Sequence, residues 1–226
     1  MGVTRRSEED WTRLRKALVE RLRETEDLSE RALAALLAVP RHVFVPPRER
    51  SESYHNHPLP IGERQTISQP YMVGWLVDAL RVRPGMRVLE IGTGCGYQAA
   101  VLAAAGAEVW SVEIRPRLSM RARINLASVG LESIHLRVGD GASGWPEAAP
   151  FHGIVLTAAP LEVPLALFSQ LAPDGVLVAP VGPRHEVQSL VRYQRPKPGS
   201  LPTPEPLGGC VFVPMIDPHG RQHRAR

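Results

Sequence analysis

A glycine-rich turn constrains the fold of this chain more than any other feature. It reads VLEIGTGCG over residues 88–96 and joins a hydrophobic stretch to an alanine-rich one. Glycines at alternate positions permit positive φ and let a ligand approach the backbone closely. An ordinary strand-to-helix turn has less need of such glycines. The run therefore indicates the ligand-binding turn of an α/β fold.

Two ligands compete for this turn. A dinucleotide site would place a third glycine at position 97, where this chain has Tyr97. The spacing is instead E-x-G-x-G-x-G, which is associated with S-adenosylmethionine. That cofactor carries no phosphate, and Glu90 at the strand end would place negative charge near its cationic methionine part. We therefore expect S-adenosylmethionine as the cofactor.

Short apolar stretches alternate with helical patterns around this turn. Such alternation indicates βαβ units and a parallel, doubly wound α/β sheet. Two further strands are expected to return as an antiparallel hairpin, at 186–194 and 208–215. The other expected strands cover residues 87–91, 108–113, 134–138, 153–157 and 176–181, and the expected helices cover residues 71–80, 97–105, 116–129 and 163–171.

The N-terminal part has a helical pattern instead. Trp11, Leu14, Leu18 and Leu22 recur at helical spacing, and Ser29 is a candidate N-cap for a second helix. A loop is expected at residues 51–62. We expect a single domain over residues 1–226, with a helical cap at 8–50, a core that includes the C-terminal hairpin at 51–216, and a disordered polar tail at 217–226.

Two later strands also end in residues suited to a nucleoside. Glu113 ends the strand after the glycine turn, where an acid binds the ribose hydroxyls in nucleotide-binding α/β folds. Asp140 follows the next strand and is a candidate partner for the adenine amino group, with Gly141 leaving room for the ring. A surface carboxylate and a simple turn are the respective alternatives.

Composition narrows the class of protein. The chain has 226 residues, a formal net charge of +4 and no long apolar run, so neither a membrane span nor a secretory signal is expected. We expect a cytoplasmic protein. The arginines are scattered, so no nucleic-acid partner is expected. Cys95 and Cys210 form no metal-binding spacing, and His55-x-His57 lacks a partner nearby in the sequence, so no metal is expected.

A set of motifs carries a family resemblance. In order, the chain contains PLPIG, QTISQPYM, VLEIGTGCGYQ, VEI, GDG, TAAP, GVLVAPVG and FVPM. Together they resemble the protein-L-isoaspartate O-methyltransferases over residues 35–215. The resemblance implies a seven-stranded, Rossmann-like methyltransferase sheet with an N-terminal helical cap. It also implies methylation of the free α-carboxylate of L-isoaspartyl residues in damaged proteins and peptides, which initiates repair through a succinimide.

The resemblance also assigns site residues. In the family's pattern, Ser68 orients the substrate carboxylate as the catalytic residue. The substrate would further contact Ile61, Gln65, Thr66, Val213 and Pro214. The cofactor would contact Glu90, Gly92, Thr93, Gly94, Cys95, Glu113, Asp140, Gly141 and Thr157.

An uncharged acceptor loop suits this chemistry. A carboxylate is already ionised at neutral pH, since its reference pKa is about 4, so no general base is needed. A hydroxyl can orient one oxygen without the tight pairing of a lysine or arginine. The alternative for Ser68 is a capping role at the helix that begins near Pro70.

The chain departs from its relatives at three positions. Relatives commonly have Asp at Asn56, Gly at Arg64, and a polar or basic residue at Val211. These departures leave the substrate preference less defined than the reaction class. Cys95 replaces a small residue and is expected to pack rather than react.

Three functions remain open at this stage. The first is repair of isoaspartyl residues. The second is a dedicated methyltransferase that esterifies Asp in one peptide precursor to mature it by aspartimide formation. The third is a non-catalytic scaffold, which would not need Ser68, Glu90 and Glu113 together. A monomer is expected.

Overall fold

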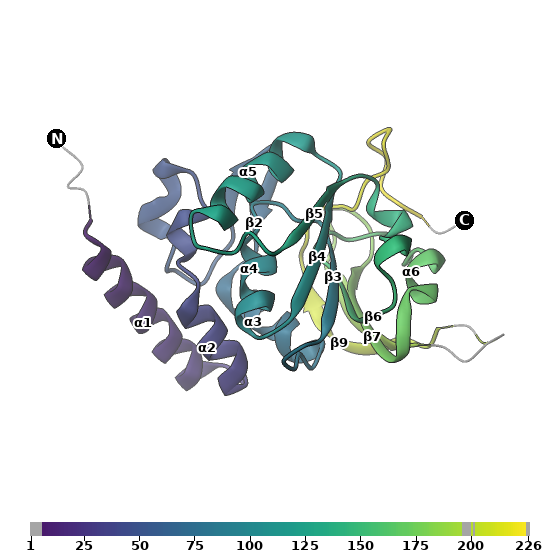
Figure 1. Cartoon of the computed structure of the whole chain (residues 1–226), viewed down its shortest axis with the longest axis horizontal. Coiled ribbons are helices and arrows are strands. Elements are labelled where there is room, and N and C mark those ends of the chain that lie inside the picture. The colour runs from purple at the N-terminus through teal and green to yellow at the C-terminus, as the bar shows by residue number, and fades with distance from the viewer. Residues whose placement is uncertain (1–5, 196–199, 201, 225–226) are drawn as a thin grey trace.

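A seven-stranded sheet forms the centre of the computed structural model, which describes residues 6–195, 200 and 202–224. The strand order is β5-β4-β3-β6-β7-β8-β9 (Figure 1). Neighbouring strands from β5 to β7 are parallel, and β8 and β9 add in antiparallel fashion. The strands are β3 (Arg87–Ile91), β4 (Glu108–Glu113), β5 (His135–Val138), β6 (Phe151–Leu156), β7 (Leu171–Val181), β8 (Gln188–Gln194) and β9 (Glu205–Cys210).

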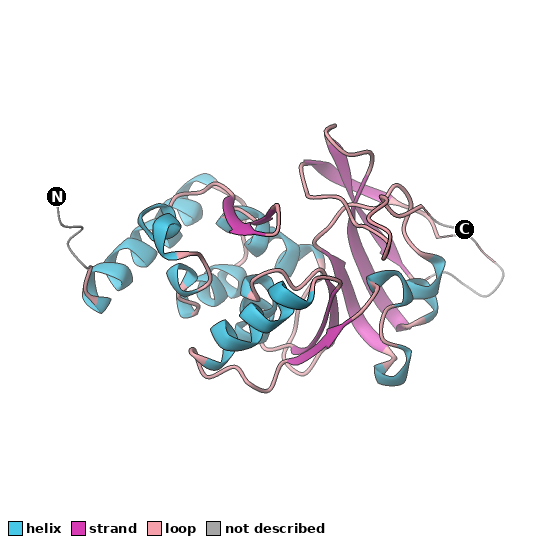
Figure 2. Cartoon of the chain, turned by 90° about the horizontal axis from the view of Figure 1, so that it is seen from above, coloured by secondary structure: helices cyan, strands magenta, loops and turns pink. Residues whose placement is uncertain are grey.

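Helices cover both faces of this sheet (Figure 2). Alternate residues of β3 point to opposite faces, so Val88 joins one hydrophobic core and Leu89 joins the other. The doubly wound α/β prediction is therefore confirmed. The larger core includes residues of α1 (Glu8–Thr25), α2 (Glu30–Ala38), α3 (Pro70–Ala79), α4 (Tyr97–Ala104) and α5 (Pro116–Ala127), and the smaller core includes α6 (Leu165–Ser169).

The N-terminal helices begin where the sequence predicts. Ser7 and Asp10 form a capping box at the start of α1. The hydroxyl of Ser29 accepts a hydrogen bond from the Ala32 N–H at 3.2 Å and caps α2. Short 3₁₀ turns follow at η1 (Arg41–Val43) and η2 (Pro47–Glu52).

The predicted loop at residues 51–62 is wrong in its last part. β1 (Leu59–Gly62) pairs with β2 (Gln65–Ile67) as an antiparallel hairpin, which we call the acceptor hairpin. Glu63 and Arg64 turn the chain with φ of 51° and 57°. This left-handed region favours glycine, so Glu63 and Arg64 occupy backbone conformations that a glycine would adopt more readily.

The C-terminal prediction needs two corrections. β9 ends at Cys210 rather than near residue 215, and the chain then leaves the sheet to form a parallel bridge between Pro214 and Ala159. The tail is also not disordered over residues 217–224, because Gln222 pairs with Ile216 and its amide donates to the carbonyls of Ala159 and Gly182 at 3.0 and 2.9 Å. Residues 225–226 lie outside the described part.

The tail is polar, but its polar groups form hydrogen bonds that order it, so the composition misled the prediction of disorder. Asp217 organises a turn by accepting hydrogen bonds from the N–H groups of His219 and Arg221 at 2.9 and 3.0 Å. The remaining turns of the chain are η3 (Gly141–Ser143) and η4 (Pro146–Ala148).

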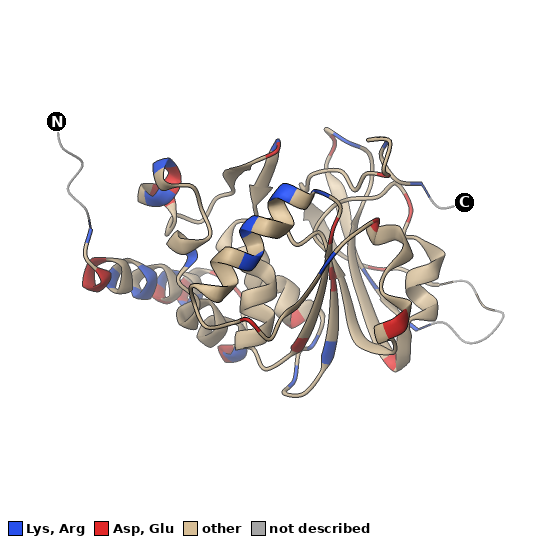
Figure 3. Ribbon diagram, turned by 45° about the horizontal axis from the view of Figure 1, so that its top comes forward, with Lys and Arg blue, Asp and Glu red and all other residues tan. Residues whose placement is uncertain are grey.

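Charged side chains of both signs are spread over the surface. Acidic and basic positions are mixed along α1, whereas α5 carries basic positions only (Figure 3). None of the described helices is both long and apolar enough to cross a bilayer.

Candidate functional site

A pocket lies at the carboxyl ends of β3, β4 and β6. The strand order reverses between β3 and β6, and ligands of open α/β sheets bind at such a switch point. The pocket contains the predicted site residues with two exceptions, Ile61 and Asp140. Those that line it are Gln65, Thr66, Ser68, Glu90, Gly92, Thr93, Gly94, Cys95, Glu113, Gly141, Thr157, Val213 and Pro214.

The two exceptions have other contacts. Ile61 is a buried residue of β1 in the acceptor hairpin, and its carbonyl accepts a hydrogen bond from Arg121 Nη1 at 2.5 Å. Asp140 Oδ1 accepts from the Ala142 N–H at 2.9 Å and so caps η3. Gly141 itself lines the pocket next to Asp140, and it leaves no room for a side chain, because a Cβ there would lie 2.3 Å from Ile91 Cγ2.

The glycine turn adopts the backbone that the sequence predicts. Gly92, Gly94 and Gly96 have φ of 105°, 56° and 92°. A side chain at Gly92 would lie 2.5 Å from Thr157 Oγ1, and that hydroxyl donates to the Gly92 carbonyl at 2.5 Å. Thr157 therefore holds the turn from the end of the neighbouring strand β6.

Glu90 is a buried carboxyl group at the base of the pocket. Its Oε2 accepts a hydrogen bond from Ser111 Oγ at 2.5 Å, and Ser111 Oγ lies 2.6 Å from Thr93 Oγ1. Its Oε1 has no partner among the described residues. Burial raises the pKa of Glu90 to about 8, and the negative charge of Glu113 adds to this effect. The unpartnered oxygen suits a cationic or hydrogen-bond-donating ligand.

Glu113 is held by backbone groups on both oxygens. Its Oε2 accepts from the Gly94 N–H at 2.8 Å, and its Oε1 accepts from the Arg115 N–H at 2.9 Å. Burial raises the pKa of this carboxyl, and the backbone donors oppose that effect. A carboxylate has about four lone-pair sites, so both oxygens can accept again from a pair of ligand hydroxyls.

Ser68 does not cap α3, which rules out the alternative role for this residue. The N-cap of α3 is Gln69, and it makes no side-chain cap bond. Asn56 takes over this task, because its Oδ1 accepts from the Tyr71 N–H at 3.0 Å. The departure at position 56 is therefore conservative, since Asn and Asp both offer an acceptor oxygen there.

Arg41 holds the backbone on both sides of the acceptor hairpin. The sequence analysis did not predict this role. Its guanidinium is fully buried, with Nη1 donating to the Ser68 carbonyl at 2.7 Å and Nη2 donating to the His57 carbonyl at 3.2 Å. The Cζ atom lies 5.1 Å from the ring centroid of Tyr97. Burial lowers the pKa of Arg41. A basic residue among apolar ones in VPRHVFVPP was the only sequence signal.

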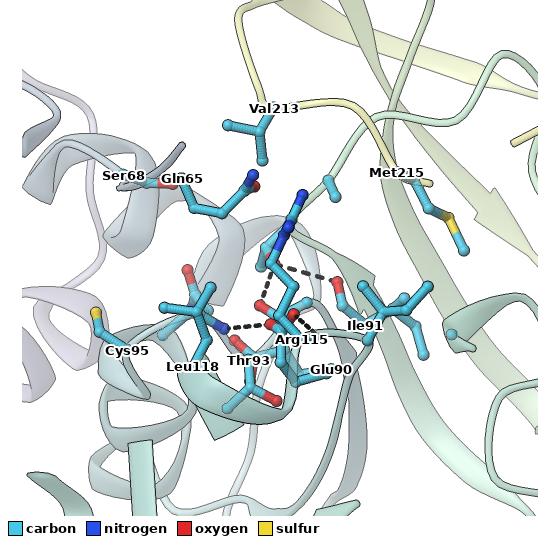
Figure 4. A pocket seen from close by; sticks show the side chains of 18 of the residues that line it. Gln65, Ser68, Glu90, Ile91, Thr93, Cys95, Arg115, Leu118, Val213 and Met215 are labelled. Carbon is cyan, nitrogen blue, oxygen red and sulfur yellow. Dashed lines mark hydrogen bonds between the residues drawn. The ribbon is translucent and has the colours of Figure 1, made fainter. Parts of the chain in front are cut away.

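Arg115 and Ser111 were also missed. Arg115 lines the pocket and points from the end of β4 toward Gln65 and Val213, above Glu90 (Figure 4). Ser111 offered a signal, because it is a polar residue inside the hydrophobic stretch VWSVEI. Cys95 behaves as expected of a packing residue, since burial raises the pKa of its thiol to about 11.

Together these features define a methyltransferase of the S-adenosylmethionine-dependent α/β class. At the glycine turn the pocket has a buried acid, Glu90, with an unpartnered oxygen, and at the end of the next strand it has a second acid, Glu113, held by backbone N–H groups. Both features suit this cofactor. A resident dinucleotide would instead need the third glycine that Tyr97 replaces.

Comparisons with known proteins identify the family. The family model described as Protein-L-isoaspartate(D-aspartate) O-methyltransferase (PCMT) matches residues 13–220. The protein-L-isoaspartate O-methyltransferase of Methanoculleus marisnigri is 52% identical over 193 residues, which cover 85% of this chain and 86% of that protein. The Gloeobacter violaceus protein of the same name is 47% identical over 204 residues, covering 90% of this chain and 98% of that protein.

Solved structures agree with this result. A protein-L-isoaspartate O-methyltransferase superposes with a TM-score of 0.81 at 28% identity, covering 91% of this chain and 67% of that one. A Plasmodium falciparum structure in complex with S-adenosyl-L-homocysteine has the same fold, with a TM-score of 0.77 at 22% identity, covering 89% of this chain and 98% of that one.

The chain belongs to the protein-L-isoaspartate O-methyltransferase family. The family resemblance, the methyltransferase fold and the S-adenosylmethionine-dependent reaction class expected from the sequence are confirmed.

Proposed function

We propose that this chain methylates the free α-carboxylate of L-isoaspartyl residues in damaged proteins and peptides. The observation that carries the proposal is the position of Ser68, whose capping task is taken by Asn56 and which faces the same pocket as Glu90 and Glu113. The methyl ester would then re-close spontaneously to a succinimide, whose hydrolysis returns some normal aspartate.

We assign the cofactor to the wall at the carboxyl ends of the strands. S-Adenosylmethionine supplies an electrophilic methyl group on a positively charged sulfur when bound. Glu113 accepts from the ribose hydroxyls, and Glu90 lies where its ionised form balances positive charge. The backbone and small side chains of Gly92, Thr93, Gly94, Cys95, Gly141 and Thr157 complete this wall.

We assign the substrate to the opposite wall. Gln65, Thr66 and Ser68 come from the acceptor hairpin and its exit, and Val213 and Pro214 come from the segment after β9. Main-chain groups on both sides suit an extended peptide. A second hollow, lined by Thr66, Ser68, Val211 and Val213 among others, continues outward from this wall and offers the path for flanking residues.

The proposed reaction needs placement rather than proton transfer. One oxygen of the ionised substrate carboxylate attacks the methyl carbon, the carbon–sulfur bond electrons return to sulfur, and the positive charge is lost. The products are a neutral methyl ester and S-adenosylhomocysteine. The Ser68 hydroxyl donates to the other carboxylate oxygen and fixes its direction, and well-oriented attack can lower such barriers by up to about 7–11 kcal/mol.

Relatives favour repair over maturation of a single peptide precursor. The matched proteins are named protein-L-isoaspartate O-methyltransferases, and they have nearly the length of this chain. We further propose that the chain acts as one domain, as a monomer, and in the cytoplasm.

Paired peptides test this proposal. Tritiated S-adenosylmethionine is offered with an isoaspartyl peptide and, separately, with its normal aspartyl twin of identical sequence. We expect label only in the isoaspartyl ester. Equal labelling of both peptides, or none in either, rejects repair, and selective labelling of the aspartyl twin supports the maturation activity instead.

A further inference from the structure

Three metal-ligating side chains come together outside the pocket. Glu52 ends η2, and His55 and His57 follow in the segment that leads to β1. The expectation that the two histidines have no carboxylate partner overlooked Glu52, three residues before His55, and the structure brings its carboxylate close to both rings. Glu52, His55 and His57 are therefore a candidate metal site next to the acceptor hairpin.

The spacing of the ligand atoms suits zinc. Glu52 Oε2 lies 3.6 Å from His57 Nε2 and accepts a hydrogen bond from His55 Nδ1 at 2.8 Å, whose proton a bound metal ion would displace. The three potential ligand atoms all lie within 4.8 Å of one another. Tetrahedral zinc with bonds of about 2.0–2.1 Å separates its ligand atoms by roughly 3.3 Å. The separations of 2.8 and 3.6 Å lie on either side of that value.

The histidine at position 57 is also held in the required tautomer. Its Nδ1 lies 3.0 Å from the Pro58 carbonyl, which can only accept, so Nδ1 carries the proton. In the neutral ring the lone pair is then on Nε2, the nitrogen that faces Glu52. A backbone carbonyl that fixes the far nitrogen is the usual outer support of a metal-bound histidine.

A simple ion pair between Glu52 and protonated histidines is the competing explanation. The three side chains are about half exposed, with relative accessibilities of 45%, 56% and 46% for Glu52, His55 and His57. An ion pair exposed to this degree contributes little to stability, so it gives the three side chains little reason to converge. A shared cation accounts for the convergence of all three ligand atoms.

We propose that Glu52, His55 and His57 bind one Zn²⁺ ion, with water at the fourth position. Two imidazoles and one carboxylate suit zinc rather than calcium or magnesium, which prefer oxygen ligands. The site is connected to the pocket. Arg41 bonds the carbonyl of His57 with one arm and the carbonyl of Ser68 with the other, so an ion on His57 restrains the backbone that holds Ser68.

Zinc titration of the full-length, tag-free protein tests the proposal by calorimetry near neutral pH. We expect saturable binding of one ion per chain. Glu52→Gln and His55→Ala each weaken it at least tenfold, whereas the control His219→Ala, an exposed histidine in the tail, leaves it unchanged. Thermal unfolding of each metal-free variant verifies that it is folded.

Cobalt provides a second readout. Co²⁺ at the same site gives a visible absorption spectrum of tetrahedral character, which His55→Ala abolishes. The proposal is overturned by the absence of saturable binding, or by binding that Glu52→Gln and His55→Ala leave intact. Neither measurement depends on methyl transfer, so the metal site and the proposed function stand or fall separately.

Discussion

Ser68 and Asn56 divide two tasks at the start of α3. Asn56 reaches across from the preceding loop and bonds the Tyr71 N–H, while Pro70 needs no partner because it has no N–H. Ser68 can therefore keep its hydroxyl for the pocket. A serine just before a helix often acts as its N-cap. Here Asn56, 12 residues before Ser68, accepts a hydrogen bond from the N–H of the first helical turn instead.

Replacement of the Ser68 hydroxyl should impair turnover more than cofactor binding. A hydrogen bond to a charged group contributes about 1.5–3 kcal/mol, so Ser68→Ala should lower kcat roughly 10- to 100-fold. The affinity for S-adenosylmethionine, measured by calorimetry, should change little. Ser128→Ala is a matched control, because its hydroxyl bonds only the Asn125 carbonyl on α5. Weaker cofactor binding with normal residual turnover would assign Ser68 to the cofactor.

Glu90 should make the stability of the ligand-free protein depend on pH. Its pKa is about 8 when folded, against 4.5 for the ordinary side chain. Between these values the unfolded chain releases the proton and the folded chain keeps it, so stability is full below about pH 4.5 and falls as the pH rises toward 8. One pKa unit corresponds to about 1.4 kcal/mol, so the change amounts to a few kcal/mol.

The Glu90→Gln variant isolates this effect. Its melting temperature, relative to that of the unmodified protein, should rise steadily from pH 5 to pH 8. Glu132→Gln, at an exposed position, should show no such trend. Parallel melting curves for Glu90→Gln and the unmodified protein across this range would contradict a raised pKa.

At the scale of elements, Arg41 joins η1 to the two segments that flank the acceptor hairpin, through the carbonyl of His57 before β1 and the carbonyl of Ser68 after β2. Arg41→Met relieves the desolvation of a buried cation but leaves the carbonyls of His57 and Ser68 without donors. An unsatisfied buried group costs about 1–3 kcal/mol, so we expect a net loss of about 2 kcal/mol in the free energy of unfolding. Turnover should fall as well, because the backbone of Ser68 loses its support.

Denaturant unfolding and steady-state kinetics check this prediction. Arg41→Lys should recover part of both losses, since an ammonium group can reach one carbonyl. Arg48→Met, at an exposed arginine of the neighbouring η2, serves as the control. If Arg41→Met folds stably and its kcat is unchanged, Arg41 contributes to packing but does not position Ser68 for turnover.

The elements that the sequence predicted well have local signals. β3 and β4 have the predicted bounds, because each is a short apolar run that stops at an acid or a glycine. The acceptor hairpin was missed because its turn uses Glu63 and Arg64 in a conformation that these residue types rarely adopt. The site acids at 90 and 113 were predictable from the glycine spacing, whereas the burial of Arg41 depends on distant segments that meet only in the folded chain.

At the scale of the whole molecule, the C-terminal tail supports the substrate wall. His223 donates its N–H to the Met215 carbonyl at 2.8 Å, and the His223 carbonyl accepts from the Leu161 N–H at 2.8 Å. Met215 in turn donates to the Ala159 carbonyl at 2.8 Å. The tail, the segment 213–215 and the loop after β6 therefore form one hydrogen-bonded layer beside the pocket.

Truncation after Ile216 should weaken both the fold and the substrate wall. The tail contributes several hydrogen bonds of about 1 kcal/mol each, and 1 kcal/mol shifts the melting temperature of a protein of this size by about 2–4 °C. We expect a decrease of roughly 10 °C and a lower kcat/KM for the isoaspartyl peptide. A chain that ends at Arg224 should match the full-length protein. Identical melting and kinetics after the longer deletion would show that the layer is dispensable.

The proposed substrate wall also limits which folded proteins can serve as substrates. The proposed substrate wall is built by the acceptor hairpin and the segment 211–216, which line two adjoining hollows, and we propose that a single extended strand of main chain binds there. A damaged residue inside a helix or sheet has to detach from its neighbours before it can enter. Repair of a native client should then proceed no faster than its local opening, so rigid proteins would keep their lesions longest.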